Sequence, residues 1–484
     1  INRAKHAKKS FAAAWDSQFG SWEYQAVMNK DVGTEIVCDF EDGDTQSMSG
    51  AEWYKVIYES NSGWALSSNG TIFRHDIKAV VPGLLERWYA ERKVMQSKMR
   101  EAITSGDTKQ IAFWDKRQLV KKINLNSLYG ALLNPGCRFF DIRIGQSVTL
   151  TGRTITKHMA AQTNQILADK YDHVGDSIIY GDTDSVYFSA WPLVKEQVEN
   201  KEIEWTKDSV INLYDTIGDE VNKSFPNFMK DAFGVVKSQG EIIQAGREMV
   251  ASSGLFITKK RYAALIYDLE GERKDVDGKL GKIKAMGVDL KRSDTPEFVQ
   301  RFLEELLTMV LSGNTKEDCF DKINKFKEHF TLKPGWEKGT PKRVNNLTKY
   351  REMVETYNRK TQQMSITGQG SDTLKKPIMP GHVRASMNWN ELRKAYKDKY
   401  SLPIMDGQKV IVCTLKSNPM GYTSIAYPID ELQLPEWFKT LPFANKEMEQ
   451  KIIDQKVKNL IGVLGWELEE TQRVNVFDTI FATG

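Results

Sequence analysis

The stretch Tyr180-Gly181-Asp182-Thr183-Asp184-Ser185 places two carboxylates among the residue types of a tight turn. Residues that favour β-structure precede and follow it, so the pattern predicts strand, turn and strand over residues 176–190. Asp182 and Asp184 then lie close together on a rigid hairpin. Mg²⁺ sites use few protein oxygen ligands and let substrate phosphates complete the shell. The stretch therefore predicts a divalent-metal site. The alternative is an ordinary Asp-rich β-turn, because Gly and Asp are common in turns.

A second pattern, KKINLNSLYG at residues 121–130, closes a helix predicted over Thr108–Leu132. Lys122, Asn126 and Tyr129 stand at i, i+4 and i+7, so one helical face carries a cation, an amide and an aromatic ring. A cation there can bind a polyphosphate, and a tyrosine can pack on a base or a sugar. The alternative is a solvated lysine beside a core leucine.

The sequence before this helix predicts an antiparallel partner helix. The partner begins at Pro82, whose fixed φ suits a first turn, and runs to about residue 103. Gly106 stops it, and Asp107 can cap the helix that follows. Arg92 and Gln96 share a face of the first helix, so the pair can direct Arg92 and Lys122 into one anionic pocket.

Further along the chain, extended segments are predicted at residues 260–268 and 282–287. Thr295 and Pro296 predict the N-cap and first turn of a helix that ends at Gly313. Residues 337–400 contain fourteen Lys and Arg against six Asp and Glu, interleaved with tyrosine and tryptophan. Such a segment suits a surface that follows phosphates, although a solvated basic face explains the composition as well.

Composition sets the outer limits. At 484 residues the chain is long enough for about three domains, and 40% apolar with 27% charged residues is typical of a soluble globular protein. Its four cysteines lack CxxC spacing and its six histidines form no HExxH or HxH cluster, which argues against a disulfide scaffold and against a protein-ligated zinc site.

The order of these motifs, the KxxxNSxYG helix and then YGDTDS, resembles family B DNA polymerases, most closely those of T-even-like tailed bacteriophages. The resemblance extends through Lys259-Lys260-Arg261-Tyr262, which is similar to the KKRY segment of that family, and through residues 284–287 and 344–347. It covers the chain from about Asn69 to the end. A reverse transcriptase fits poorly, because the helix motif belongs to the family B pattern.

The resemblance implies roles for the residues that match. Asp184 would be the metal-bridging carboxylate and Asp182 its less direct companion, with two Mg²⁺ ions as cofactor. Arg92 and Lys122 would bind the triphosphate of a dNTP, Asn126 would support that helix face, and Tyr129 would check the nascent base pair. The DNA-binding residues would be Lys259, Lys260, Arg261 and Tyr262, which hold primer–template.

The resemblance also implies an α+β fold of right-hand polymerase architecture, with an antiparallel palm sheet, helical-hairpin fingers and a mixed thumb. Residues 1–79 would be a partial palm, 80–133 the fingers, 134–279 the palm and 280–484 the thumb. Phe477, Ile480 and Phe481 stand at i, i+3 and i+4 in the C-terminal tail and suit a groove on a partner. The resemblance implies that this partner is a sliding clamp; the alternative is a tail packed on its own thumb.

This sequence departs from the family in several places. Gln96 stands where related phage enzymes tend to carry a second lysine, and Gly246 stands where an acidic residue is expected. The DxxSLYP segment with a further aspartate (motif A) is absent, as is the acidic pattern of an exonuclease. One turn with two carboxylates provides too few ligands for two divalent ions. We therefore hypothesise the C-terminal part of a split polymerase, with a second chain that carries exonuclease and motif A.

The first residue, Ile1, is not a methionine, which fits a chain whose beginning lies elsewhere, whether the split is natural or the chain was trimmed. The predicted function is replicative nucleotidyl transfer to a primer 3′ end, in the cytoplasm of an infected bacterial host. The alternative is a non-catalytic DNA-binding subunit that retains the polymerase fold.

Overall fold

The computed structural model describes residues 20–175, 177–367 and 375–468. The chain forms two compact units, residues 1–247 and 248–484, and each is described by itself. Both units combine helices with antiparallel sheets, so the predicted α+β class is confirmed. The right-hand architecture and its domain boundaries stay predictions. None of the helices in the described ranges is long and apolar enough to cross a lipid bilayer.

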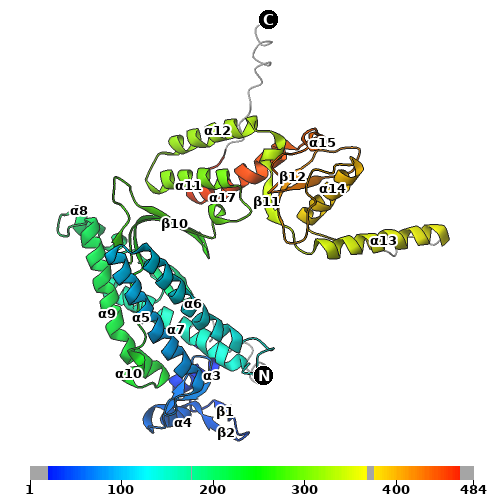
Figure 1. The fold of residues 1–484 in the computed structure, drawn as a ribbon. Helices are drawn as coiled ribbons and strands as arrows, with labels where there is room; N and C mark the ends of the chain where they lie inside the picture. The colour runs from blue at the N-terminus through cyan, green and yellow to red at the C-terminus, as the bar shows by residue number, and fades with distance from the viewer. Residues whose placement is uncertain (1–19, 176, 368–374, 469–484) are drawn as a thin grey trace. The chain divides into compact units, whose positions relative to one another are not determined.

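The first unit begins with the short elements drawn in blue in Figure 1, and their apolar side chains share one core. Tyr24 and Tyr58 both donate hydrogen bonds of 2.8 Å to the carbonyl of Ala232, which joins these elements to a long helix much later in the chain. A hairpin around Asn69 pairs two short strands, β3 and β4. The elements are α3 (Trp22–Met28), β1 (Glu35–Asp39), β2 (Thr45–Ser49), α4 (Gly50–Tyr54), the π-helix η1 (Lys55–Glu59), β3 (Trp64–Leu66) and β4 (Ile72–Arg74).

Two long helices, α5 (Val80–Ser105) and α6 (Thr108–Leu132), form the predicted αα-hairpin. Gly106 ends α5 with φ of 72°, a conformation that glycine adopts without steric cost, and the Asp107 carboxylate caps α6. Among the described side chains of these helices, only Ala102 and Leu132 are buried. Most of the hairpin surface is therefore open to solvent or to a ligand.

The helices α7 (Ile142–Ala168) and α9 (Lys207–Phe233) form the body of the first unit. Ile217, Val221 and Phe225 of α9 pack against apolar side chains of α7. The imidazole of His158, 4% exposed, joins the two helices: it lies 2.9 Å from the Ser224 hydroxyl and stacks on a phenylalanine of α9. The remaining elements are β5 (Ile178–Asp182), β6 (Ser185–Phe188), α8 (Trp191–Glu199) and α10 (Lys237–Gly240).

The second unit contains two antiparallel sheets and one extended apolar core. In the first sheet the strand order is β10-β8-β7, with β9 on β8, and in the second it is β11-β12-β13. The strands are β7 (Met249–Thr258), β8 (Arg261–Leu269), β9 (Glu272–Arg273), β10 (Lys282–Met286), β11 (Thr340–Arg343), β12 (Lys409–Thr414) and β13 (Ser424–Pro428).

Helices cover both sheets of the second unit. The helix predicted from Thr295 begins one residue later than expected: Pro296 is its N-cap residue, and the Thr295 hydroxyl donates to the Asp289 carbonyl instead of capping. The helices are η2 (Asp289–Lys291), α11 (Glu297–Leu311), α12 (Lys316–Leu332), η3 (Gly335–Lys338), α13 (Leu347–Thr367), α14 (Gly381–Ala395), α15 (Glu436–Lys439), α16 (Asn445–Glu449), η5 (Gln450–Asp454), α17 (Gln455–Ile461) and η6 (Gly462–Leu464).

Candidate active site

The YGDTDS stretch forms the predicted β-hairpin. Asp182 of β5 pairs with Ser185 of β6, so Thr183 and Asp184 make up a two-residue loop. Thr183 adopts φ of 54°, in the left-handed region that β-branched residues rarely occupy. The Ser185 hydroxyl donates to the Asp182 carbonyl at 3.0 Å and closes the turn. We call β5, β6 and this loop the acidic hairpin.

The two carboxylates of the acidic hairpin differ in their surroundings. Asp182 is half-buried, and its Oδ1 accepts a hydrogen bond of 3.1 Å from the Thr183 hydroxyl. Asp184 is exposed, and within the described ranges no residue forms a hydrogen bond or ion pair with its carboxylate. Its oxygens are therefore open to a ligand from solution. The same ranges contain no group of three or more His, Cys, Asp or Glu that is able to hold a metal ion.

The acidic hairpin is anchored to α7 by a contact that the sequence did not predict. The Thr156 hydroxyl lies 2.9 Å from the Thr183 carbonyl oxygen, to which it donates, and 3.0 Å from the carbonyl oxygen of Gly152 in its own helix. The residues of the first contact are far apart in sequence, so no local pattern marks it. The loop therefore takes part of its support from a helix outside its own sheet.

The predicted nucleotide-binding face lies on α5 and α6. Lys122 and Asn126 are exposed, and neither side chain has a partner in the described part of the chain. Arg92 of α5 donates from Nε to Gln118 of α6 at 3.3 Å. Gln118 and Lys122 are one helical turn apart, so the guanidinium lies beside the face that carries Lys122. A common anionic pocket for Arg92 and Lys122 stays a prediction.

Lys121, not Lys122, binds the partner helix. The Lys121 ammonium pairs with Glu91 of α5 and lies 5.6 Å from the ring centroid of Trp88. Successive helical residues point about 100° apart, so the inward direction of Lys121 leaves its neighbour facing outward. The sequence did not indicate which of the two lysines contacts α5. In the structure Lys121 contacts α5 and Lys122 is exposed to solvent.

Tyr129 connects this face to α7. It is half-buried, and its hydroxyl donates to the Gly145 carbonyl at 3.2 Å, near the start of α7. Thr156, which holds the acidic hairpin, lies further along the same helix. At 1.5 Å per residue, the two anchoring positions are about 16 Å apart along the helix axis. One rigid helix therefore fixes both the carboxylate loop and the aromatic end of the cationic face.

The KKRY residues form the tip of a second hairpin, in the second unit. Thr258 of β7 pairs with Arg261 of β8, so Lys259 and Lys260 are the two-residue loop. Both lysines are exposed, and Lys260 has φ of 62°. We call β7, β8 and this loop the basic hairpin.

Tyr262 is buried opposite Phe256 of the neighbouring strand. It is 2% exposed, and its ring stacks on Phe256 with centroids 5.5 Å apart. The hairpin therefore presents its lysines on the surface and keeps its tyrosine as internal support.

The basic segment 337–400 has mixed surroundings. Lys338 is buried, and burial lowers the pKa of its ammonium, which donates to the Thr331 carbonyl at 2.9 Å. Lys342 pairs with Asp294 at 2.8 Å. By contrast, Arg359 and Lys360 of α13 are exposed. Only part of the positive charge in this segment therefore faces solvent. Phe477, Ile480 and Phe481 lie outside the described residues.

A model of DNA polymerase family B matches residues 46–228 and 236–376, more than half of the chain. The chain belongs to DNA polymerase family B. The matched ranges contain every predicted site residue from Arg92 to Tyr262. The resemblance to T-even phage polymerases, drawn from the motifs, is confirmed by similarity to the two phage proteins described next.

The DNA-directed DNA polymerase of Escherichia phage RB69 is 26% identical over 322 residues, which are 64% of this family B chain and 33% of the relative. The DNA-directed DNA polymerase of Enterobacteria phage T4 is 27% identical over 323 residues, again 64% and 33%. The DNA polymerase alpha catalytic subunit of Trypanosoma brucei brucei is 26% identical over 250 residues, 51% of this chain and 16% of the relative. The matched region thus spans about a third of each phage relative.

Proposed function

We propose that this chain supplies the fingers, most of the palm and the thumb of a replicative DNA-directed DNA polymerase, which extends a primer at its 3′ end. The observation that carries the proposal is the exposed Asp184 carboxylate, open to a ligand on a hairpin anchored to α7. The same helix holds the Tyr129 end of a cationic helix face. The family match supplies the context for both.

The acidic hairpin would hold Mg²⁺ through the oxygens of Asp182 and Asp184. Bound divalent ions would activate the primer hydroxyl and stabilise charge on the leaving phosphate. The chain's own side chains position the reactants. Lys122 and Arg92 would bind the triphosphate, and Tyr129, with its hydroxyl fixed on Gly145, would pack against the nascent base pair.

DNA would be held by the second unit. Lys259 and Lys260 protrude from the basic hairpin and would bind backbone phosphates of primer–template. The exposed cations of α13 would extend this grip without reading bases, since phosphate contacts carry no sequence information.

The metal site needs a further carboxylate, and we propose that a second chain with exonuclease and the motif A aspartate provides it. The number of ligands supports this proposal, because two carboxylates on one turn are too few for two Mg²⁺ ions.

Primer extension tests this division. We expect the chain alone to extend poorly and the chain mixed with a polypeptide that carries the DxxSLYP segment to extend efficiently. Robust synthesis by the chain alone contradicts the proposed division but leaves the polymerase assignment intact.

The catalytic assignment is tested in the reconstituted complex with Asp184→Asn, which keeps the side-chain size and removes the charge. We expect extension to fall by at least about 100-fold, because a group that stabilises developing charge typically contributes that much. The matched control is Asp169→Asn, which neutralises an exposed carboxylate at the end of α7 and should retain activity. Unchanged synthesis by the Asp184 variant favours the non-catalytic DNA-binding subunit.

The proposed clamp contact rests on the tail pattern at Phe477, Ile480 and Phe481. Deletion of residues 477–484 should reduce the length of products only when the clamp is present. An equal loss without clamp would instead indicate that the tail packs on its own thumb.

A further inference from the structure

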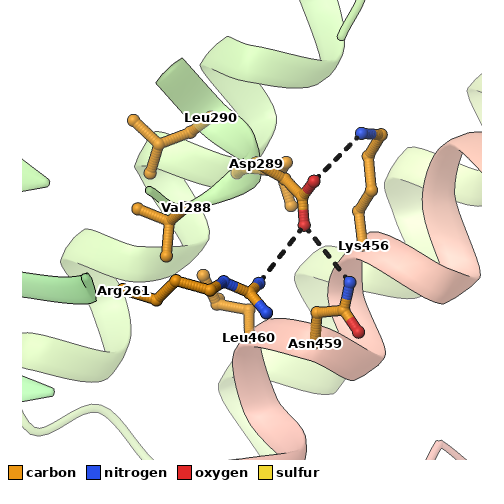
Figure 2. A pocket seen from close by; sticks show the side chains of 8 residues that line it. Arg261, Val288, Asp289, Leu290, Lys456, Asn459 and Leu460 are labelled. Atoms are coloured by element: carbon orange, nitrogen blue, oxygen red, sulfur yellow. Dashed lines mark hydrogen bonds and ion pairs between the residues drawn. The ribbon is translucent and has the colours of Figure 1, made fainter. Parts of the chain in front are cut away.

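Asp289 is the centre of a polar cluster behind the basic hairpin (Figure 2). Its side chain is only 15% exposed and lies in η2, directly after the β10 strand and Gly287. Donors from two distant parts of the unit converge on this carboxylate. They are Arg261 at the start of β8, and Lys456 and Asn459 on α17. The cluster therefore joins the KKRY motif to a C-terminal helix through one acidic side chain.

The contacts on the α17 side are the shorter ones. Lys456 Nζ lies 3.3 Å from Asp289 Oδ1, and Asn459 donates from Nδ2 to Oδ2 at 3.3 Å. The same ammonium donates to the Thr295 hydroxyl at 2.9 Å, and this hydroxyl donates to the Asp289 carbonyl at 2.8 Å. Both the side chain and the main chain of Asp289 are thus fixed from α17.

The contact on the hairpin side is looser. Arg261 Nη2 lies 3.8 Å from Asp289 Oδ2, an ion pair beyond hydrogen-bond distance, and the arginine side chain is 35% exposed. A guanidinium has five N–H donors, and this pairing uses none of them fully. Asp289 therefore attracts one side of the guanidinium and leaves its donors available to a further acceptor.

The backbone links Asp289 to the lysine loop as well. Gly287 has φ of 64°, and a Cβ built on it would lie 2.0 Å from the carbonyl oxygen of Lys260. The segment that carries Asp289 thus packs directly against the tip of the basic hairpin. A displacement of this segment would be transmitted to the loop and to Arg261 together.

We propose that Asp289 is a positioning residue for DNA binding: it orients the Arg261 guanidinium so that its remaining donors bind a backbone phosphate of the primer–template duplex. The inference rests on the proposed function, which assigns the basic hairpin to this DNA. Lys456 and Asn459 of α17 hold the Asp289 carboxylate in place. The carboxylate therefore stays fixed when the Arg261 side chain moves, and it can orient the guanidinium.

The salt dependence of DNA binding distinguishes positioning from the other roles of a buried carboxylate. Each phosphate contact contributes about 0.9 to the slope of log affinity against log salt. Asp289→Ala should therefore lower this slope by about 0.9 and weaken binding roughly eightfold at 0.1 M salt, as Arg261→Ala does. If Asp289 merely reduced the positive field, its removal would instead strengthen binding and leave the slope equal or steeper.

The measurement uses the full chain and a fluorescently labelled primer–template duplex, titrated by anisotropy over a series of KCl concentrations. The double variant Asp289→Ala/Arg261→Ala should bind as weakly as Arg261→Ala alone, because both remove the same contact. Asp289→Glu, which keeps the charge, should recover most of the slope. The matched control is Asp275→Ala, which removes a carboxylate paired with Arg273 in the same unit and changes the net charge equally.

Each outcome supports or overturns the inference. A lower melting temperature with an unchanged slope shows a structural role for Asp289 and overturns it. An equal effect of Asp275→Ala assigns the loss to net charge and also overturns it. If Asp289→Ala does not fold, Asp289→Asn, which keeps an acceptor for Lys456, is subject to the same criteria. If Arg261→Ala and Lys260→Ala leave the slope unchanged, the DNA-binding assignment of the hairpin fails, whatever Asp289 does.

Discussion

The acidic and the basic hairpin have the same backbone arrangement, but their loops carry side chains of opposite charge. Each connects two antiparallel strands by a two-residue loop, and each loop contains a non-glycine residue with positive φ, Thr183 at 54° and Lys260 at 62°. Positive φ at such residues costs free energy of order 1 kcal/mol or more. Both loops are therefore held in place by their surroundings, and the two surroundings differ.

The basic hairpin is supported by its own sheet and by the segment that follows the β10 strand. It belongs to a four-stranded sheet, Tyr262 is buried beneath it, and Gly287 packs against the carbonyl at its tip. The acidic hairpin has two strands, and the hydroxyl of Thr156 on α7 holds its loop from outside the hairpin. A loop proposed to bind DNA phosphates needs only its own chain for support, whereas a loop proposed to bind metal ions has to leave room for further ligands.

Among the variants that test this difference in support, the largest loss of stability is expected from Gly287→Ala. The new Cβ would lie 2.0 Å from the Lys260 carbonyl oxygen, and φ of 64° is unfavourable for alanine. Backbone has to move, so we expect the free energy of unfolding of the second unit to fall by about 3–5 kcal/mol. Urea denaturation followed by tryptophan fluorescence measures the loss.

Gly278→Ala is the matched control for this variant. Gly278 has a similar φ of 74°, but a Cβ there meets nothing within 4 Å. Its cost should be limited to the backbone term of about 1–2 kcal/mol. Equal losses in the two variants would mean that the close approach to Lys260 contributes nothing to the rigidity of the basic hairpin.

Local signals explain what could be predicted from the sequence. The cap residues Gly106 and Asp107 act on their immediate neighbours, and the αα-hairpin was predicted with the correct turn. The start of α7 at Ile142 was not predicted, because its first turns mix polar and small residues and the cap at Asp141 was overlooked. Strand β7 was missed, since it contains adjacent serines and Gly254.

The candidate site follows the same rule. The Asp182–Asp184 turn and the helix face at Lys122 depend on residues close together in sequence, and both were predicted. The supports at Thr156 and Asp289 depend on residues that meet only after folding. The burial of Tyr262 belongs to this second kind, because the KKRY motif identifies the residue but not the direction of its ring.

The next largest effect concerns His158, which stabilises the helices behind the acidic hairpin. Burial lowers the pKa of its imidazole from 6.5 to about 4. As pH falls from about 6.5 to about 4, the unfolded chain takes up a proton that the folded site does not. Through this window the His158 site should therefore cost the first unit on the order of 3 kcal/mol of stability, and this contribution should not grow below about pH 4.

Thermal melting from pH 4 to pH 7 tests this expectation. His158→Gln should be less stable at pH 7 and should lose most of the pH dependence. His173→Gln should retain most of it, because His173 lies in the same unit but is about a third exposed and burial lowers its pKa too. An unchanged pH dependence in the His158 variant would show that other groups are responsible. Hydrogen exchange resolves the effect by unit, and the basic hairpin should not respond.

The smallest effect on stability, and the most specific for the acidic hairpin, is expected from Thr156→Val. Valine keeps the shape of the side chain and removes the hydroxyl that donates to the Thr183 carbonyl. The exposed carbonyl can bind water instead, so the free energy of unfolding should fall by only about 1 kcal/mol. Thr149→Val is the matched control, because among the described residues the Thr149 hydroxyl bonds only carbonyls of its own helix. If the contact positions the metal-binding loop, primer extension by the reconstituted complex should fall about tenfold for Thr156→Val and stay unchanged for Thr149→Val. Equal activity of the two variants would mean that the acidic hairpin holds its geometry without α7.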